Sequence, residues 1–232
     1  MRILALESSG LVASVAVVED SQTIAEYTVN YKKTHSQTLL PMLDEVAKMT
    51  DLDLATVDAI AVSGGPGSFT GLRIGSATAK GLGLALKKPL VHVPTLEGLA
   101  WNLAGTSSLV CPIMDARRSQ VYTGLYKVEE ELSVIVDQRA IAVDDLIKEL
   151  NERNEHVTFL GDGVPVYYDR LEEGLTVSHS YAAVHSNRQR GASVAELGMR
   201  YFKEGKTTTP EDYKPEYLRQ SQAERERAGR EK

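Results

Sequence analysis

The sequence predicts an α/β protein made of two copies of a β-β-β-α-β-α unit, arranged as two lobes of which the second is reduced. Apolar runs, alternating runs and helical periodicities follow one another in the same order in both halves. The opening strand of each half ends in a carboxylate, Glu7 in the first and Asp115 in the second. A glycine loop follows the fourth strand of each half, which completes the correspondence.

The first half is predicted to form an N-terminal lobe over residues 1–106. Its short apolar or alternating runs indicate strands, and its helices show apolar positions three and four residues apart. The expected strands cover 3–6, 12–18, 23–29, 59–62 and 90–93, and the expected helices cover 36–49, 71–86 and 96–104.

The second half, 107–219, is predicted to repeat this order in a degenerate form, because it is less apolar after Gly161. Strands are expected over 109–114, 120–128, 133–143 and 156–160, and Asp144 is expected to cap a helix that ends near Arg153. Residues 220–232, with alternating Arg and Glu, are expected to form a polar tail. A duplication of this order is typical of the actin-like (ASKHA, or RNase H-like) fold.

Composition narrows the classes of function. The chain has 232 residues, 42% of them hydrophobic and 25% charged, with a net charge of −6. This charge argues against a protein that holds nucleic acid by itself, which needs a clustered positive surface. The single cysteine, Cys111, fits a reducing compartment. No apolar run approaches the length of a membrane span, and Glu7 comes too early for a signal peptide. We therefore expect a cytoplasmic protein that makes no membrane contact.

The run from Gly64 to Gly75 is the most informative stretch of the chain. It joins a strand to a helix, and five glycines in twelve residues are costly in backbone entropy unless the chain needs them. A glycine-rich loop before a helix N-terminus can bind an anion. It lacks the Lys-Ser/Thr of a Walker A motif and the spacing of a dinucleotide fingerprint. The residues of this candidate nucleotide or anion loop are Glu7, Gly65, Gly67, Ser68 and Thr70, with Thr70 as the expected N-cap. The alternative for Glu7 is a carboxylate that only begins a turn.

The helix after this loop carries two rows of small residues. Gly71, Gly75, Ala79 and Gly83 form one row, and Ala77, Gly81 and Ala85 form the other. A glycine inside a helix costs about 1 kcal/mol against alanine, so a closely packed neighbour must offset it. That neighbour is either the chain's own fold or a partner, and two rows favour the partner. The predicted partner interface comprises His35, Leu39, Leu40, Leu43, Arg73, Gly75, Ala79 and Gly83.

Four blocks, in order along the chain, resemble the TsaB (YeaZ) family of bacteria. They run from His35 to Met42, from Gly65 to Gly75, from Met114 to Tyr122 and from Pro215 to Arg219. The glycine block is highly specific and the others corroborate it. The resemblance implies an actin-like fold of two lobes. It also implies a role in adding a threonylcarbamoyl group to N6 of adenosine 37 in tRNAs that read ANN codons.

In that family the subunit is not the catalyst. The resemblance implies that it pairs with a larger catalytic paralogue, TsaD, and that a small ATPase, TsaE, joins the pair. Contact with tRNA is then expected only through the complex, and the isolated chain is expected to form a homodimer. No cofactor is expected on this chain alone, whereas ATP and Mg²⁺ could act in the complex.

Two local features bear on this expectation. The paralogue carries a His-x-x-x-His metal pair, and Thr95 and Leu99 stand at those places here, so no metal site and no catalytic residue are expected. Glu7 stands where the family usually has aspartate, which disfavours a Mg²⁺–phosphate role. Two alternatives to the scaffold remain: an independent ATPase or small-molecule kinase, and, well behind it, a metallopeptidase.

Overall fold

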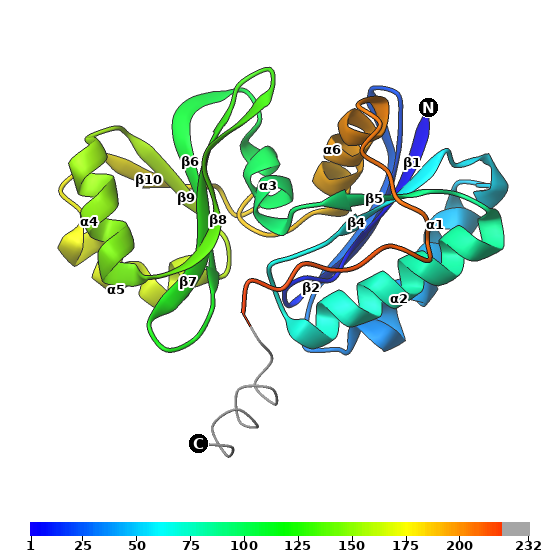
Figure 1. Ribbon diagram of the computed structural model, residues 1–232, viewed down its shortest axis with the longest axis horizontal. Helices are drawn as coiled ribbons and strands as arrows, with labels where there is room; N and C mark the ends of the chain where they lie inside the picture. Colours follow the sequence, from blue (N-terminus) through cyan, green and yellow to red (C-terminus); the bar gives the residue numbers. More distant parts are fainter. Residues whose placement is uncertain (220–232) are drawn as a thin grey trace, which may run out of the picture.

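The computed structural model describes residues 1–219 and consists of two lobes, each built around a five-stranded mixed sheet (Figure 1). The first lobe contains β1 (Arg2–Glu7), β2 (Val12–Glu19), β3 (Gln22–Asn30), α1 (His35–Met49), η1 (Leu54–Thr56), β4 (Ala59–Ser63), α2 (Phe69–Leu86) and β5 (Leu90–Val93). The lobes are connected by α3 (Thr95–Ala100) and η2 (Trp101–Leu103). Then follow β6 (Thr106–Asp115), β7 (Gln120–Val128), β8 (Leu132–Ala142), α4 (Val143–Arg153), β9 (Val157–Leu160), α5 (Gly163–Gly174), β10 (His179–Tyr181) and α6 (Gly191–Lys203).

The two sheets have the same topology, which confirms the predicted duplication. The strand order is β3-β2-β1-β4-β5 in the first sheet and β10-β9-β6-β7-β8 in the second. The opening strand of each half pairs antiparallel with the next strand and parallel with the fourth. Each opening strand therefore lies at the centre of its sheet, and both carboxylates, Glu7 and Asp115, lie at the ends of central strands.

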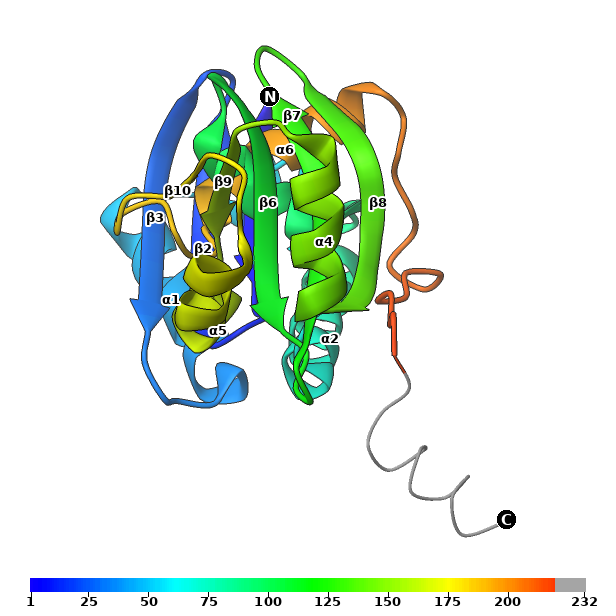
Figure 2. The same cartoon turned by 90° about the vertical axis from the view of Figure 1, so that its left-hand side faces the viewer.

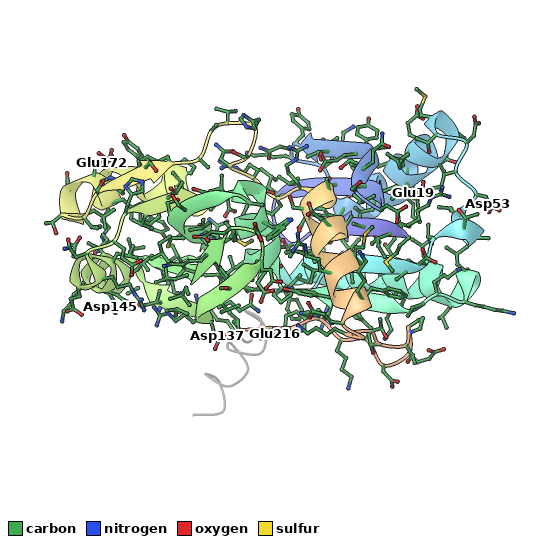
Figure 3. All side chains as sticks on the ribbon, turned by 90° about the horizontal axis from the view of Figure 1, so that it is seen from above. Glu19, Asp53, Asp137, Asp145, Glu172 and Glu216 are labelled. Atoms are coloured by element: carbon green, nitrogen blue, oxygen red, sulfur yellow. The ribbon has the colours of Figure 1, made fainter. Side chains whose placement is uncertain are left out.

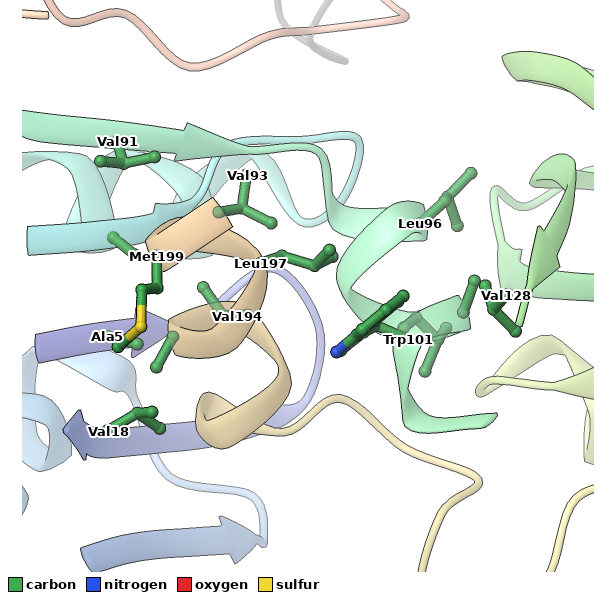
Figure 4. Close-up of a cluster of buried hydrophobic side chains, with 14 of the residues drawn as sticks. Ala5, Val18, Val91, Val93, Leu96, Trp101, Val128, Val194, Leu197 and Met199 are labelled. Carbon is green, nitrogen blue, oxygen red and sulfur yellow. The ribbon is translucent and has the colours of Figure 1, made fainter. Parts of the chain in front are cut away.

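Successive side chains of the central strand point to opposite faces of the first sheet, and both faces are packed against apolar residues. Leu4 and Leu6 of β1 face a core formed with α1 and α2, whereas Ile3 and Ala5 face a second core. That second core extends into the other lobe through α3, α6, β6 and β7, and Figure 4 shows Leu96 and Trp101 beside Val128. A third core joins the second sheet to α4 and α5. The two lobes therefore share one apolar cluster.

The helix α6 corrects the predicted division of the chain. It lies within 107–219 in sequence, but it packs on β1, β2 and β4 of the first sheet (Figure 1). A Cβ on Gly198 would lie 2.5 Å from the Cβ of Ala61, so this glycine allows the helix to approach the sheet closely. Glu26 of β3 accepts a bond from the amide of Ala192 and pairs with Arg190, which fastens the start of α6. Residues 191–203 therefore belong to the first lobe in space.

Several local predictions were also wrong. The N-cap of α2 is Ser68, whose Oγ accepts from the amide of Gly71, and Thr70 lies within the first turn. The N-cap of α4 is Ala142, and Asp144 lies in its first turn. The sequence patterns also did not predict α5, β10 or α6, and β10 completes a five-stranded sheet in the second lobe.

After α6 the chain returns along the first lobe as an extended segment, residues 206–219, which we name the C-terminal strap (Figure 2). Thr208 pairs with Leu90 at the edge of the first sheet, with both backbone bonds at 2.9 Å. Tyr213 is 2% exposed and belongs to the core under α2. The predicted polar tail, 220–232, lies outside the described residues.

Candidate functional site

A cavity of about 570 Å³ lies between the lobes, where the turns after β1 and β6 face each other. It brings together residues that are far apart in the sequence. Its lining includes Ser9, Gly67, Phe69, Asp115, Arg117 and Tyr217. This cleft is where the predicted anion loop would act.

Glu7 does not reach the cleft. Its side chain is 1% exposed, and Oε1 accepts bonds from the amide and the hydroxyl of Ser9 at 2.6 and 2.5 Å. Burial raises the pKa of the Glu7 carboxyl above its ordinary value of 4.5, against the opposing effect of these bonds. Glu7 therefore fixes the β1–β2 turn, and the structure favours the turn interpretation over a phosphate–metal role.

The raised pKa makes stability depend on pH. Between pH 4.5 and the raised folded value, the folded chain holds a proton at Glu7 that the unfolded chain has lost. The free energy of unfolding should therefore fall as pH rises through this window. We expect Glu7→Gln to reduce that fall, as measured by urea unfolding between about pH 5 and pH 8. Glu45→Gln, on the exposed side of α1, is the control. If the free energy of unfolding of Glu7→Gln falls with pH as steeply as that of the native chain, Glu7 is not the group responsible for this pH dependence.

The glycine loop is packed against the chain itself. A Cβ on Gly65 would lie 2.1 Å from the carbonyl oxygen of Glu216, and one on Gly67 would lie 2.2 Å from that of Ser9. The amide of Gly65 donates to Thr95 Oγ1 at 3.1 Å, and the amide of Ser68 donates to the carbonyl of Ser9 at 2.6 Å. Only Ser68 and Thr70 of the predicted loop are exposed. The glycines therefore allow close intramolecular contact.

The turn after β6 forms the other wall of the cleft. Arg117, Arg118 and Ser119 all have left-handed backbones, with φ of 66°, 57° and 56°. Such conformations are costly for residues other than glycine, so the surroundings must hold the turn. Asp115 Oδ1 accepts from the amide of Arg117 and from the hydroxyl of Tyr167, both at 2.9 Å. Asp115, like Glu7, is engaged in fixing its own turn.

A Mg²⁺–nucleotide group bound in this cleft would need particular donor atoms around it. A carboxylate must face the metal, and free amides must face the phosphates. Here Glu7 is buried, two amides of the loop bond within the chain, and the strap lies over the loop. The donor set does not fit that group.

The two positions on α3 that the resemblance assigned to a lost histidine pair, Thr95 and Leu99, are buried. Thr95 and Leu99 of α3 are each 1% exposed, and Thr95 bonds to the glycine loop. Within residues 1–219 there is no group of three or more His, Cys, Asp or Glu side chains arranged to hold a metal ion.

The two rows of small residues on α2 have different roles. The first row was predicted to contact a partner, but the structure places it inside the chain's own fold. Gly75, Ala79 and Gly83 are buried in the chain's own fold. A Cβ on Gly75 would lie 2.3 Å from Ser8 Oγ, and one on Gly83 would lie 2.8 Å from Pro210 Cγ. The first row therefore packs on the first sheet and the strap, and offers nothing to a partner.

The second row is exposed. Ala77, Gly81 and Ala85 face outward, and a Cβ on Gly81 would have no heavy atom of residues 1–219 within 4 Å. Leu84, which the sequence reading overlooked, is 53% exposed on the same helix. The guanidinium of Arg73 is also exposed and lies 4.0 Å from the ring centroid of Phe69.

The other helix contributes fewer of its predicted residues. Leu39 and Leu43 of α1 are buried in the core, whereas Leu40 is 54% exposed. The Nε2 of His35 lies 3.1 Å from the carbonyl oxygen of Val12, so this half-buried imidazole helps to hold the start of α1. The helices α1 and α2 contact each other, and both have exposed apolar or small residues. We name Leu40, Ala77, Gly81, Leu84 and Ala85 the α1–α2 face.

The sequence reading gave no role to Tyr217 and Arg219, although both lie in a block that it singled out. The ring of Tyr217 lies 4.7 Å from that of Phe69, and Arg219 donates to the carbonyl of Ala116 at 2.7 Å. No periodicity could have shown this, since the strap is irregular.

The two similar lobes and the cleft between them are shared with known proteins. The profile of the family described as "TsaD: tRNA N6-adenosine threonylcarbamoyltransferase" matches residues 22–227. The chain is 34% identical to "tRNA threonylcarbamoyladenosine biosynthesis protein TsaB" of Bacillus subtilis (strain 168), over 97% of this chain and 96% of that protein. It is 30% identical to the protein of the same name from Escherichia coli (strain K12), over the full length of both.

Solved structures agree with the sequence comparison. "YeaZ from Pseudomonas aeruginosa" superposes with a TM-score of 0.77 at 26% identity, covering 94% of this chain and all of that one. A polyphosphate/ATP-glucomannokinase from Arthrobacter sp. strain KM, 8% identical with a TM-score of 0.52, shares the fold alone. Within the TsaD-like family that the profile defines, the chain belongs to the TsaB (YeaZ) family.

Residues 1–219 contain no helix with the length and hydropathy that a membrane span requires.

Proposed function

We propose that this chain is the non-catalytic dimerisation subunit of the complex that adds a threonylcarbamoyl group to N6 of adenosine 37 in tRNAs that read ANN codons. Its full-length similarity to two proteins named for threonylcarbamoyladenosine biosynthesis carries the proposal. The chain would act in the cytoplasm, bind a TsaD-like catalytic paralogue and meet tRNA and a TsaE-like ATPase only within the complex.

The geometry supports a scaffold rather than a catalyst. The carboxylates that end β1 and β6 are both engaged in fixing turns, and the place of the paralogue's histidine pair is filled by Thr95 and Leu99. These features favour the scaffold over an independent ATPase or small-molecule kinase, and over a metallopeptidase. They also support the view that this chain alone holds no nucleotide, with ATP and Mg²⁺ acting in the complex.

The α1–α2 face is the proposed site of pairing. Small residues on a helix allow another helix to approach closely, because the side chains at the contact set the interaxial distance. Leu40 and Leu84 would supply the apolar area of the contact. In the absence of the paralogue, a second copy would occupy the same face and form a two-fold homodimer.

Reconstitution tests the proposal. The chain, its TsaD-like paralogue, the TsaE-like ATPase and the enzyme that makes threonylcarbamoyl-AMP would be combined with unmodified tRNA, and each protein omitted in turn. We expect modification to stop when this chain is omitted, and we expect the chain alone to show no turnover of ATP. Modification that continues without the chain, or ATP turnover by the chain alone, would contradict the proposal.

A further inference from the structure

The C-terminal strap contacts both lobes at the mouth of the cleft, after a long run that is fixed to the first lobe alone. Up to Tyr213 it is held by the pairing of Thr208 with Leu90 and by Lys80. The Lys80 ammonium donates to the carbonyls of Glu211 and Tyr213, both at 3.1 Å. The strap is therefore fixed to the first lobe before it reaches the cleft.

At the mouth, the strap first joins the glycine loop. The amide of Glu216 donates to the carbonyl of Gly64 at 2.7 Å, and the missing side chain of Gly65 leaves room for the carbonyl of Glu216. Tyr217 then packs on Phe69, at the N-terminus of α2.

The same segment of the strap also contacts the second lobe. Arg219 donates to the carbonyl of Ala116 at 2.7 Å, in the turn after β6, and Gln138 of β8 donates to Glu216 Oε2 at 3.0 Å. In the view of Figure 3, Glu216 lies between the two lobes, whereas Asp145 lies on the far side of the second lobe. Residues 216–219 thus bridge the two walls of the cleft.

We propose that residues 216–219 of the strap clamp the cleft, so that the chain itself, rather than a ligand between the lobes, sets the spacing of the lobes. The lobes are already joined by the shared core around α3 and α6. A second junction at the cleft mouth removes the remaining freedom to open. This inference does not depend on the proposed function, since it concerns the chain by itself.

The distance between two spin labels, one on each lobe, tests the clamp in the full chain. Glu45→Cys on α1 and Asp145→Cys on α4 place labels at exposed positions whose side chains form no hydrogen bond or ion pair with residues 1–219, and the native Cys111 is buried. We expect the otherwise native chain to give one narrow distance distribution that ATP and Mg²⁺ leave unchanged. The variant Tyr217→Ala/Arg219→Ala should give a broader distribution shifted to a different distance.

Tyr31→Ala/Lys32→Ala, in the exposed loop before α1, is the matched control and should behave as the native chain does. Circular dichroism establishes that each variant is folded. Should the double variant fail to fold, Arg219→Ala alone gives the same measurement, because it removes only the bond to Ala116. A strap variant with the native distribution would overturn the proposal, and so would a native distribution that ATP and Mg²⁺ shift.

Discussion

A Gly81→Gln variant is expected to remain folded and to lose its pairing, both with the catalytic paralogue and with itself. A Cβ at this position has no heavy atom of residues 1–219 within 4 Å, so the fold accepts a side chain there. A partner backbone packed against the α1–α2 face would have to withdraw. We expect the dissociation constant to rise at least about 30-fold, the equivalent of about 2 kcal/mol, as is typical of a central interface residue.

Calorimetric titration of the paralogue with the variant measures the affinity for the paralogue. Sedimentation of the isolated chain measures self-association. Asp145→Gln introduces the same side chain at an exposed helix position of the second lobe, and should pair as the native chain does. Native affinity in Gly81→Gln would show that pairing uses another surface, while leaving the family assignment intact.

The same change, glycine to alanine, is expected to have opposite effects on stability at two positions of α2. At Gly71 a Cβ would lie 2.1 Å from the carbonyl oxygen of Ser8, which is backbone and cannot turn away. Overpacking of this kind costs about 1–3 kcal/mol, and the Ser8 hydroxyl would also lose its 2.9 Å bond to the carbonyl of Gly71 if the helix moved.

Gly81→Ala is the control, since the added methyl group is free of contacts and alanine favours the helix by about 1 kcal/mol. Urea unfolding at concentrations low enough to keep the chain monomeric should therefore show Gly71→Ala below the native chain and Gly81→Ala above it. Equal effects at the two positions would contradict the different roles of the two rows.

The duplicated fold could be predicted because its elements leave local signals. The apolar run of β2 follows from burial on both faces of the sheet, and the apolar spacing of α1 follows from burial on one face, so both can be detected in the sequence. The position of α6 could not be predicted in this way. Its apolar face shows that it covers a sheet, but the contact of Gly198 with Ala61 joins residues more than a hundred positions apart.

The candidate site was predicted only in part, for a related reason. Two rows of small residues on α2 are visible in the sequence, but which of them faces inward depends on how the helix is rotated over the sheet. Gly75 meets Ser8, so its row is internal, and Gly81 is left outside. Likewise the Glu7 carboxylate ends a strand as predicted, yet its bonds to Ser9 depend on a turn whose geometry no spacing reveals.

The return of α6 to the first sheet has a consequence for synthesis of the protein. Ile3, Ala5 and Ala61 present one face of that sheet to α6, which ends at Lys203. A chain that folds as it leaves the ribosome therefore keeps this face uncovered until residues 191–203 have emerged. The first lobe is completed only after most of the second lobe has been made, and until then the nascent chain carries exposed apolar surface, of the kind that chaperones recognise.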